Sequence, residues 1–139
     1  DPHAIMVEIT ETALLDDYDL AFKIMDELME NDIAVSLDDF GTGYSSISLL
    51  RHPAIRQIKI DTSFIQDLLV REESRKLVSG LVRLSQELET LLVAEGVETQ
   101  MQVDSLTSMG CDVAQGYFYC KPLEVEDVLA KIRTLNVTS

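Results

Sequence analysis

The 139-residue sequence has only two cysteines, Cys111 and Cys120, and no long apolar run. Two thiols cannot build the disulfide framework of a small secreted domain, so they indicate a reducing compartment. We expect both to be packed and inert. No segment reaches the ~18 consecutive apolar residues typical of a membrane-spanning helix, and no signal peptide is visible. The sequence therefore predicts a cytoplasmic protein, although the parent of a shortened chain would be free to carry a membrane anchor.

Basic residues are also scarce. The chain has 11 lysines and arginines against 25 aspartates and glutamates, which gives a net charge of −14. Binding along a nucleic acid requires a lysine- and arginine-rich surface, so this balance argues against a protein that tracks long DNA or RNA. It leaves room for a small phosphate ligand held through metal ions. Most of the acidic residues are explained by a solubilising surface.

Histidine is the third scarce residue. His3 and His52 are far apart in the sequence and have no serine or cysteine motif beside them. This argues against a nucleophilic triad and favours surface or structural histidines. At this length the chain is one domain or less. It starts at Asp1 and Pro2 and enters a predicted strand almost at once, so we expect it to be part of a longer protein.

Short apolar strands alternate with helices along the chain. Strands are predicted over residues 4–9, 34–37, 57–60, 91–94 and 113–115, and helices over residues 18–31, 45–50, 72–88, 99–109 and 125–135. Nearly continuous apolar strands that alternate with helices indicate an α/β fold with a buried parallel sheet. In the two longest helices the spacing predicts that these residues face the core: Leu20, Ile24 and Leu28, then Leu77, Leu81, Leu84 and Leu88.

Polar side chains stand at the carboxyl end of each predicted strand. In parallel α/β sheets and barrels, chemistry is assembled at that edge. Each residue alone is better explained as a helix cap or a solvated loop residue. Five strands that each deliver a polar residue to one edge are hard to explain by capping. These residues are Glu8 and Glu11, Asp38 and Asp39, Lys59 and Asp61, Glu95 and Glu98, and Gln115.

Asp38 and Asp39 form the most informative pair. Adjacent like charges repel, so a fold that holds them together usually supplies a cation. Together with Glu8 they offer hard oxygen ligands, for which Mg²⁺ or Mn²⁺ is the natural cation. Two adjacent carboxylates would also reach two ions, as two-metal phosphodiester hydrolysis requires. The alternative for Asp39 is a cap on the helix predicted to begin at Ser45.

Lys59 and Glu95 are the candidate catalytic residues. Lys59 lies in a buried strand and therefore needs an anionic partner. It would pair with the carboxylates, orient a water or contact phosphate, and a purely structural ion pair is the alternative. Glu95 follows four apolar residues and precedes Gly96, a setting that suits a base accepting a proton from a metal-bound water.

The remaining polar residues are expected to bind the ligand or to support this pair; they are Glu11, Asp61, Glu98 and Gln115. Glu11 and Glu98 lie one loop turn further out and are interpreted as loop-holding groups. Gln115 would hydrogen-bond a ligand or a metal-bound water.

Five segments, residues 7–11, 38–46, 59–61, 94–99 and 115–117, resemble the EAL-domain cyclic di-GMP phosphodiesterases in order and spacing. The resemblance implies a modified TIM barrel that hydrolyses cyclic di-GMP to linear pGpG with Mg²⁺ or Mn²⁺. It implies Glu8 and Asp38 as metal ligands, with Asp39 serving a second metal. Lys59 would position the attacking water, and Glu95 would act as general base or ligand.

The resemblance also implies roles for the surrounding residues. Gln115 would lie beside the base, and Glu11 and Glu98 would anchor the loop after the second strand. That loop is linked in the family to dimerisation and activation. Here it comprises Phe40, Gly41, Thr42, Gly43, Tyr44 and Ser45.

The departure from the family pattern is large. The Glu-Ala-Leu motif is absent, as are the upstream strand with its asparagine ligand and the arginine that grips the substrate phosphate. A (β/α)₈ barrel takes about 250 residues. We therefore expect residues 1–139 to be the C-terminal part of one EAL domain, a partial barrel of about five βα units. Open strand edges favour a homodimer, and sensory or GGDEF-type domains are expected upstream in the parent.

Three functions remain open at this point. In the first, the parent is a cyclic di-GMP phosphodiesterase, and this fragment carries most of the catalytic groups but is inactive by itself. In the second, the parent is a non-catalytic receptor of the same family. The third alternative is an unrelated metal-dependent barrel, such as an enolase-like enzyme with Lys59 as base.

Overall fold

The computed structural model describes residues 5–41 and 49–135, and its centre is a parallel sheet of five strands in sequential order. The strands are β1 (Met6–Thr10), β2 (Ala34–Phe40), β3 (Ile55–Ile60), β4 (Leu91–Ala94) and β5 (Val113–Ala114). All four neighbouring pairs are parallel. The predicted α/β pattern with one strand per βα unit is therefore confirmed.

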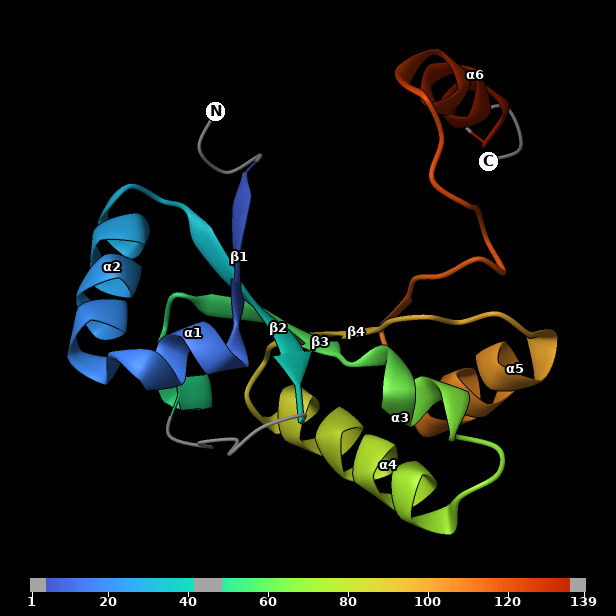
Figure 1. Ribbon diagram of the computed structural model, residues 1–139, viewed down its shortest axis with the longest axis horizontal. Helices are drawn as coiled ribbons and strands as arrows, with labels where there is room; N and C mark the ends of the chain where they lie inside the picture. The colour runs from blue at the N-terminus through green and yellow to red at the C-terminus, as the bar shows by residue number, and fades with distance from the viewer. Residues whose placement is uncertain (1–4, 42–48, 136–139) are drawn as a thin grey trace.

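Helices follow the strands and lie mainly to one side of the sheet, whereas α6 stands away from it near the C-terminus (Figure 1). They are α1 (Glu11–Asp16), α2 (Tyr18–Glu30), the 3₁₀ helix η2 (Leu49–Arg51), α3 (Thr62–Gln66), α4 (Glu72–Glu87), α5 (Gln100–Met109) and α6 (Val125–Leu135). The predicted helix over residues 45–50 falls largely outside the described residues. Among the described helices, none is long and apolar enough to cross a membrane.

Two short helices, α1 and α3, were not predicted. Each begins directly after a strand at a capping side chain. Thr10 accepts a hydrogen bond from the backbone N–H of Ala13, and Asp61 accepts one from that of Ser63. A cap and one helical turn leave too short an apolar pattern to be recognised by periodicity.

The helix faces differ from the predicted ones. In α2, Leu20 and Ile24 are 53% and 43% exposed, whereas Ala21 and Met25 are buried and Leu28 is partly buried. α2 carries a wide apolar stripe, and packing on the sheet selects the side with the smaller Ala21 at the contact.

In α4, Leu77 is exposed, whereas the neighbouring Val78 and Val82 are fully buried. Leu81, Leu84 and Leu88 are only partly buried against the core. The compact valines let the helix backbone approach the sheet, so the leucines flank the contact instead of forming its centre.

The two faces of the sheet have different chemistry because side chains alternate along each strand. One face carries Leu37, Ile58 and Leu92, which are buried in the hydrophobic core. The opposite face carries Glu8 and Lys59 among other polar groups. Three of its apolar residues, Met6, Leu91 and Val113, are 38–41% exposed, whereas Val93 is buried beside Lys59. β1 and β5 are the edge strands of the described sheet. The pairing of two copies through these edges stays a prediction.

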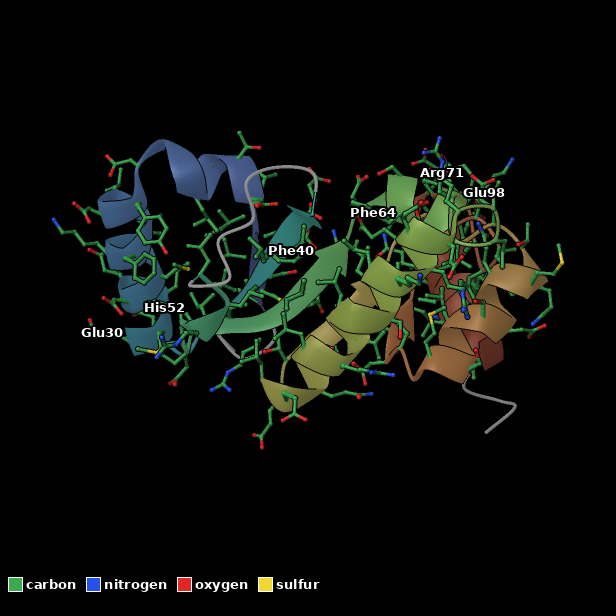
Figure 2. All side chains as sticks on the ribbon, turned by 90° about the horizontal axis from the view of Figure 1, so that it is seen from below. Glu30, Phe40, His52, Phe64, Arg71 and Glu98 are labelled. Carbon is green, nitrogen blue, oxygen red and sulfur yellow. The ribbon has the colours of Figure 1, made fainter. Side chains whose placement is uncertain are left out.

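His52 has a structural role. Its Nε2 lies 3.2 Å from Asp26 Oδ1, its Nδ1 accepts a hydrogen bond from the backbone N–H of Ala54, and its ring contacts Phe22 edge-on. Figure 2 shows His52 at the opposite end of the molecule from Glu98. His3 lies outside the described residues.

The assignment of the buried face of α2 is testable with two neighbouring residues. Met25→Ala removes a fully buried side chain, so we expect the free energy of unfolding to fall by about 2–5 kcal/mol. Ile24→Ala, at a 43% exposed position, should cost less than about 1 kcal/mol. Urea titration measures both, and equal losses for the two variants would contradict the assignment.

Candidate active site

The centre of the site is the ammonium group of Lys59, which three carboxylates surround. Lys59 Nζ lies 2.8 Å from Glu95 Oε1, 3.1 Å from Glu8 Oε2 and 3.2 Å from Asp38 Oδ1. Lys59 lies in β3, Glu8 in β1 and Asp38 in β2, and Glu95 directly follows β4. The Lys59 side chain is only 9% exposed. Four neighbouring strands therefore deliver charged groups to one point at their carboxyl edge.

The protonation of Lys59 follows from this arrangement. Burial by itself would lower the pKa of Lys59, but hydrogen bonds to Glu95, Glu8 and Asp38 outweigh it and raise the pKa above its ordinary value. Lys59 is therefore a fixed positive charge at neutral pH. A lysine with a raised pKa is a poor general base, which argues against the enolase-like interpretation in which Lys59 abstracts a proton.

A bulge in β2 places the two adjacent aspartates. Leu37 pairs with Ile58 and Phe40 with Ile60, so β2 has one residue more than β3 between these pairs. Asp39 takes up the difference with a left-handed φ of 55°, a conformation that aspartate tolerates better than most residues. Regular alternation would send the two side chains to opposite faces. The bulge instead lets oxygens of both aspartates reach the same edge.

A metal ion fits the carboxylates at this edge. One oxygen each from Asp38, Asp39 and Glu95 lies within 4.8 Å of the others. Ligands on opposite sides of an octahedral Mg²⁺ are about 4.2 Å apart, so small side-chain adjustments suffice. With Glu8, the edge has four carboxylates against the single charge of Lys59. The donors are hard oxygens and the excess charge is negative, which suits Mg²⁺ or Mn²⁺.

Glu11 joins the start of α1 to the end of β2. It is 1% exposed, and its Oε2 accepts a hydrogen bond of 3.1 Å from the backbone N–H of Gly41. A Cβ on Gly41 would lie 2.9 Å from the Phe64 ring of α3, and its φ is 101°. This turn therefore requires glycine. The loop residues Thr42, Gly43, Tyr44 and Ser45 lie outside the described residues, whereas Phe40 is buried in the core.

Gln115 and Glu98 lie beside the Lys59 centre rather than in contact with it. Together with Glu95 they line an open recess of about 330 Å³, to which Thr62 and Tyr117 also contribute. The Glu98 side chain is exposed. The recess thus places carboxylate, amide, hydroxyl and aromatic groups next to the carboxylate edge.

The structure gives Asp61 a local partner. Its side chain caps α3 by accepting hydrogen bonds from the backbone and the hydroxyl of Ser63. The contacts of Asp61 are therefore those of a helix cap, which was the alternative explanation for a polar residue at a strand end.

Two groups near the site were missed. Ser36 is fully buried and its Oγ accepts a hydrogen bond of 2.9 Å from Gln57 Nε2, directly below Asp38 and Lys59 on the same sheet face. Gln102 on α5 is also buried and bonds the loop that follows Glu95. The spacing of Thr99 and Gln102 is that of a capping box, so this signal was available in the sequence.

The fold and the site together define a parallel α/β domain with an acidic, lysine-centred site at the carboxyl edge of its sheet. The family model of the EAL domain matches residues 1–122, and the chain belongs to the EAL-domain family. The predicted family is therefore confirmed. EAL domains are TIM-barrel-like, and solved EAL domains superimpose closely on this chain, which also confirms the predicted TIM-type fold class.

Several relatives are named for cyclic di-GMP chemistry. The chain is 36% identical over 132 residues to the bifunctional diguanylate cyclase/cyclic di-GMP phosphodiesterase MucR of Pseudomonas aeruginosa, covering 95% of this chain and 19% of MucR. The solved MucR phosphodiesterase in complex with cyclic di-GMP superimposes with a TM-score of 0.86 at 36% identity, over 91% of this chain and 51% of that structure.

A second solved relative contains a metal. The manganese and cyclic di-GMP complex of BlrP1 from Klebsiella pneumoniae superimposes with a TM-score of 0.79 at 32% identity, over 84% of this chain and 30% of that structure. The chain thus spans about half of the solved MucR phosphodiesterase and a smaller share of BlrP1.

Replacing Lys59 tests the electrostatics of the site. Lys59→Met leaves Glu8, Asp38 and Glu95 without their cation, so the free energy of unfolding should fall by about 1–3 kcal/mol near neutral pH. Because folding raises the pKa of Lys59, its stabilising contribution is fully present below the unfolded value of about 10.4. It is lost as the pH rises through the folded pKa.

Urea titrations of both chains at several pH values measure this difference, which should persist up to about pH 10 and then shrink. Lys76→Met is the matched control. Its ammonium pairs with Glu72 on the surface of α4 and is 72% exposed, so the change should stay below about 0.5 kcal/mol. A Lys59→Met chain as stable as its parent would contradict the assigned ion pairs.

Proposed function

We propose that this chain supplies the metal-binding and proton-accepting part of a cyclic di-GMP phosphodiesterase site that produces linear pGpG. One observation carries the proposal: Lys59 holds Glu8, Asp38 and Glu95 at one point of the carboxyl edge. The β2 bulge brings Asp39 to the same edge. Membership of the EAL-domain family and a relative solved with cyclic di-GMP support the choice of substrate.

Glu8, Asp38, Asp39 and Glu95 are the residues that would hold one or two Mg²⁺ or Mn²⁺ ions. Two neighbouring carboxylates on a bulged strand support a two-metal arrangement, in which Asp39 serves the second ion. A bound ion would lower the pKa of a coordinated water and offset the charge of the substrate phosphate. This matters in a chain of net charge −14, which otherwise repels a phosphodiester.

Glu95 is the proposed proton acceptor. One of its oxygens accepts a hydrogen bond of 2.8 Å from Lys59, and a carboxylate retains further lone pairs to accept a proton from the attacking water. Lys59 fixes the carboxylate in position and donates its remaining hydrogen bonds to Glu8 and Asp38. In the metal-free chain its raised pKa keeps it a hydrogen-bond donor to these carboxylates.

The surrounding residues would shape the site. Glu11 holds Gly41 and thereby the turn that follows the two aspartates. Gln115 and Glu98 line the recess next to Glu95, where they would hydrogen-bond the substrate or a metal-bound water. The chain spans 51% of the solved MucR phosphodiesterase, which supports the further proposal that this chain by itself hydrolyses cyclic di-GMP poorly.

Metal binding by the chain itself is the first test. Mn²⁺ binding, measured by electron paramagnetic resonance of the free ion, should be weakened about tenfold or more by Asp38→Asn, because the variant loses one ligand charge. Asp104→Asn is the control, since Asp104 is exposed on α5 and its carboxylate accepts a hydrogen bond from Gln100 one turn away. Equal Mn²⁺ affinity in the parent and in Asp38→Asn would refute this metal site.

Hydrolysis is best tested in a complete domain. Residues 5–135 replace the matching segment of the MucR phosphodiesterase domain, and the chimera should convert cyclic di-GMP to pGpG with Mn²⁺ present. Glu95→Gln in the chimera should lower kcat by about 10²-fold or more because the proton acceptor is lost. Glu87→Gln, at an exposed position of α4, should leave kcat unchanged. A folded chimera that binds the dinucleotide without hydrolysing it would favour a receptor.

A further inference from the structure

We propose that Gln102 is a positioning residue that holds Glu95 against Lys59. A role of Gln102 in catalysis rests on the function proposed above. Its role in holding Glu95 against Lys59 rests on the described contacts alone. Gln102 lies on α5 and is 6% exposed. Within the described residues its side chain bonds to Glu98, Thr99 and Ile65 rather than to Lys59 or Glu95. It acts on them through the loop of residues 95–99.

The Gln102 side chain binds two elements at once. Its Oε1 accepts hydrogen bonds from the backbone N–H groups of Glu98 at 2.8 Å and Thr99 at 3.0 Å. Its Nε2 donates a hydrogen bond of 3.0 Å to the backbone carbonyl of Ile65 in α3. A capping box requires only the bonds to the loop. The bond to Ile65 is additional and joins the loop to a different helix.

α3 is the element that makes this bond relevant to Lys59. It begins at Thr62, three residues after Lys59. A Cβ on Gly96 would lie 2.3 Å from Cγ2 of Thr62, so the loop and the first turn of α3 are in close contact directly beside Glu95. Gln102 fastens the last turn of α3 to the other end of the same loop.

The loop is held at its other backbone groups as well. The N–H of Glu95 donates to Ile60 of β3, and the N–H of Val97 donates to Gln115. A Cβ on Gly116 would lie 2.2 Å from the Val97 carbonyl oxygen, so the neighbouring turn is packed against the loop backbone. In addition to these contacts, the Gln102 amide joins the far end of the loop to α3 by a side-chain hydrogen bond. In the proposal this bond thereby holds the Glu95 carboxylate in place relative to the Lys59 ammonium.

The experiment separates the two halves of the Gln102 amide. Gln102→Met removes both the acceptor and the donor, whereas Gln102→Glu keeps the acceptor for Glu98 and Thr99 and removes the donor to Ile65. Gln100→Met is the matched control. Gln100 lies on the same helix and its Nε2 donates to the exposed Asp104, so its loss should not reach the site.

The readout is the ¹⁵N NMR signal of the Lys59 ammonium in the metal-free chain, assigned by its absence in Lys59→Met. Both Gln102 variants should shift this signal and speed its hydrogen exchange by about threefold or more, because Glu95 is held less firmly. The amides of Glu98 and Thr99 should exchange faster only in Gln102→Met. Gln100→Met should match the parent in every measurement.

A folded Gln102→Met or Gln102→Glu chain with an unchanged Lys59 signal would overturn the proposal, even if the variant is less stable, since that pattern belongs to an ordinary helix cap. Should Gln102→Met fail to fold, Gln102→Glu carries the test because it retains the cap. Mn²⁺ binding by the same chains tests the metal site separately. A parent chain without Mn²⁺ affinity would refute that site and leave the Lys59 signal to decide the role of Gln102.

Discussion

The ion-pair cluster around Lys59 is the interaction on which the site depends. A lysine in a buried strand is costly unless anions compensate it, and several carboxylates at one edge repel each other unless a cation lies between them. Lys59, Glu8, Asp38 and Glu95 solve both problems together. The raised pKa of Lys59 shows that the hydrogen bonds to these carboxylates outweigh the cost of burying the ammonium group. In the proposed function, the remaining excess of negative charge would attract a divalent ion to this edge.

Backbone geometry adapts a regular sheet to this cluster. The bulge in β2 and the left-handed Asp39 bring two successive side chains to one edge. Gly41 packs against Phe64 and donates to Glu11, which holds the turn that follows. After β4, Gly96 likewise allows the backbone to pack closely on α3, because a Cβ at this position would clash with Thr62. The unusual backbone positions thus surround the charged groups, as expected where a fold is constrained by a site.

The prediction from the sequence succeeded where a pattern was local and failed where packing decided. The five strands and the long helices were predicted because apolar runs and helical spacing are visible without a third dimension. The short helices α1 and α3 were missed, since one turn leaves no periodic signal. In α2, Leu20 and Ile24 were assigned to the core, but a wide apolar stripe permits several orientations and contact with the sheet selects Ala21 and Met25.

The sequence by itself determined which chemical groups stand at the strand ends, because the residue types and their order along βα units are independent of distance. Only the tertiary structure decided which of them meet. It brings Glu8, Asp38 and Glu95 to Lys59, gives Asp61 to a helix cap and leaves Gln115 and Glu98 in the neighbouring recess. The physical reason is that strand register, the β2 bulge and the tether from Gln102 to α3 are contacts between segments far apart in the chain, and no local pattern specifies them.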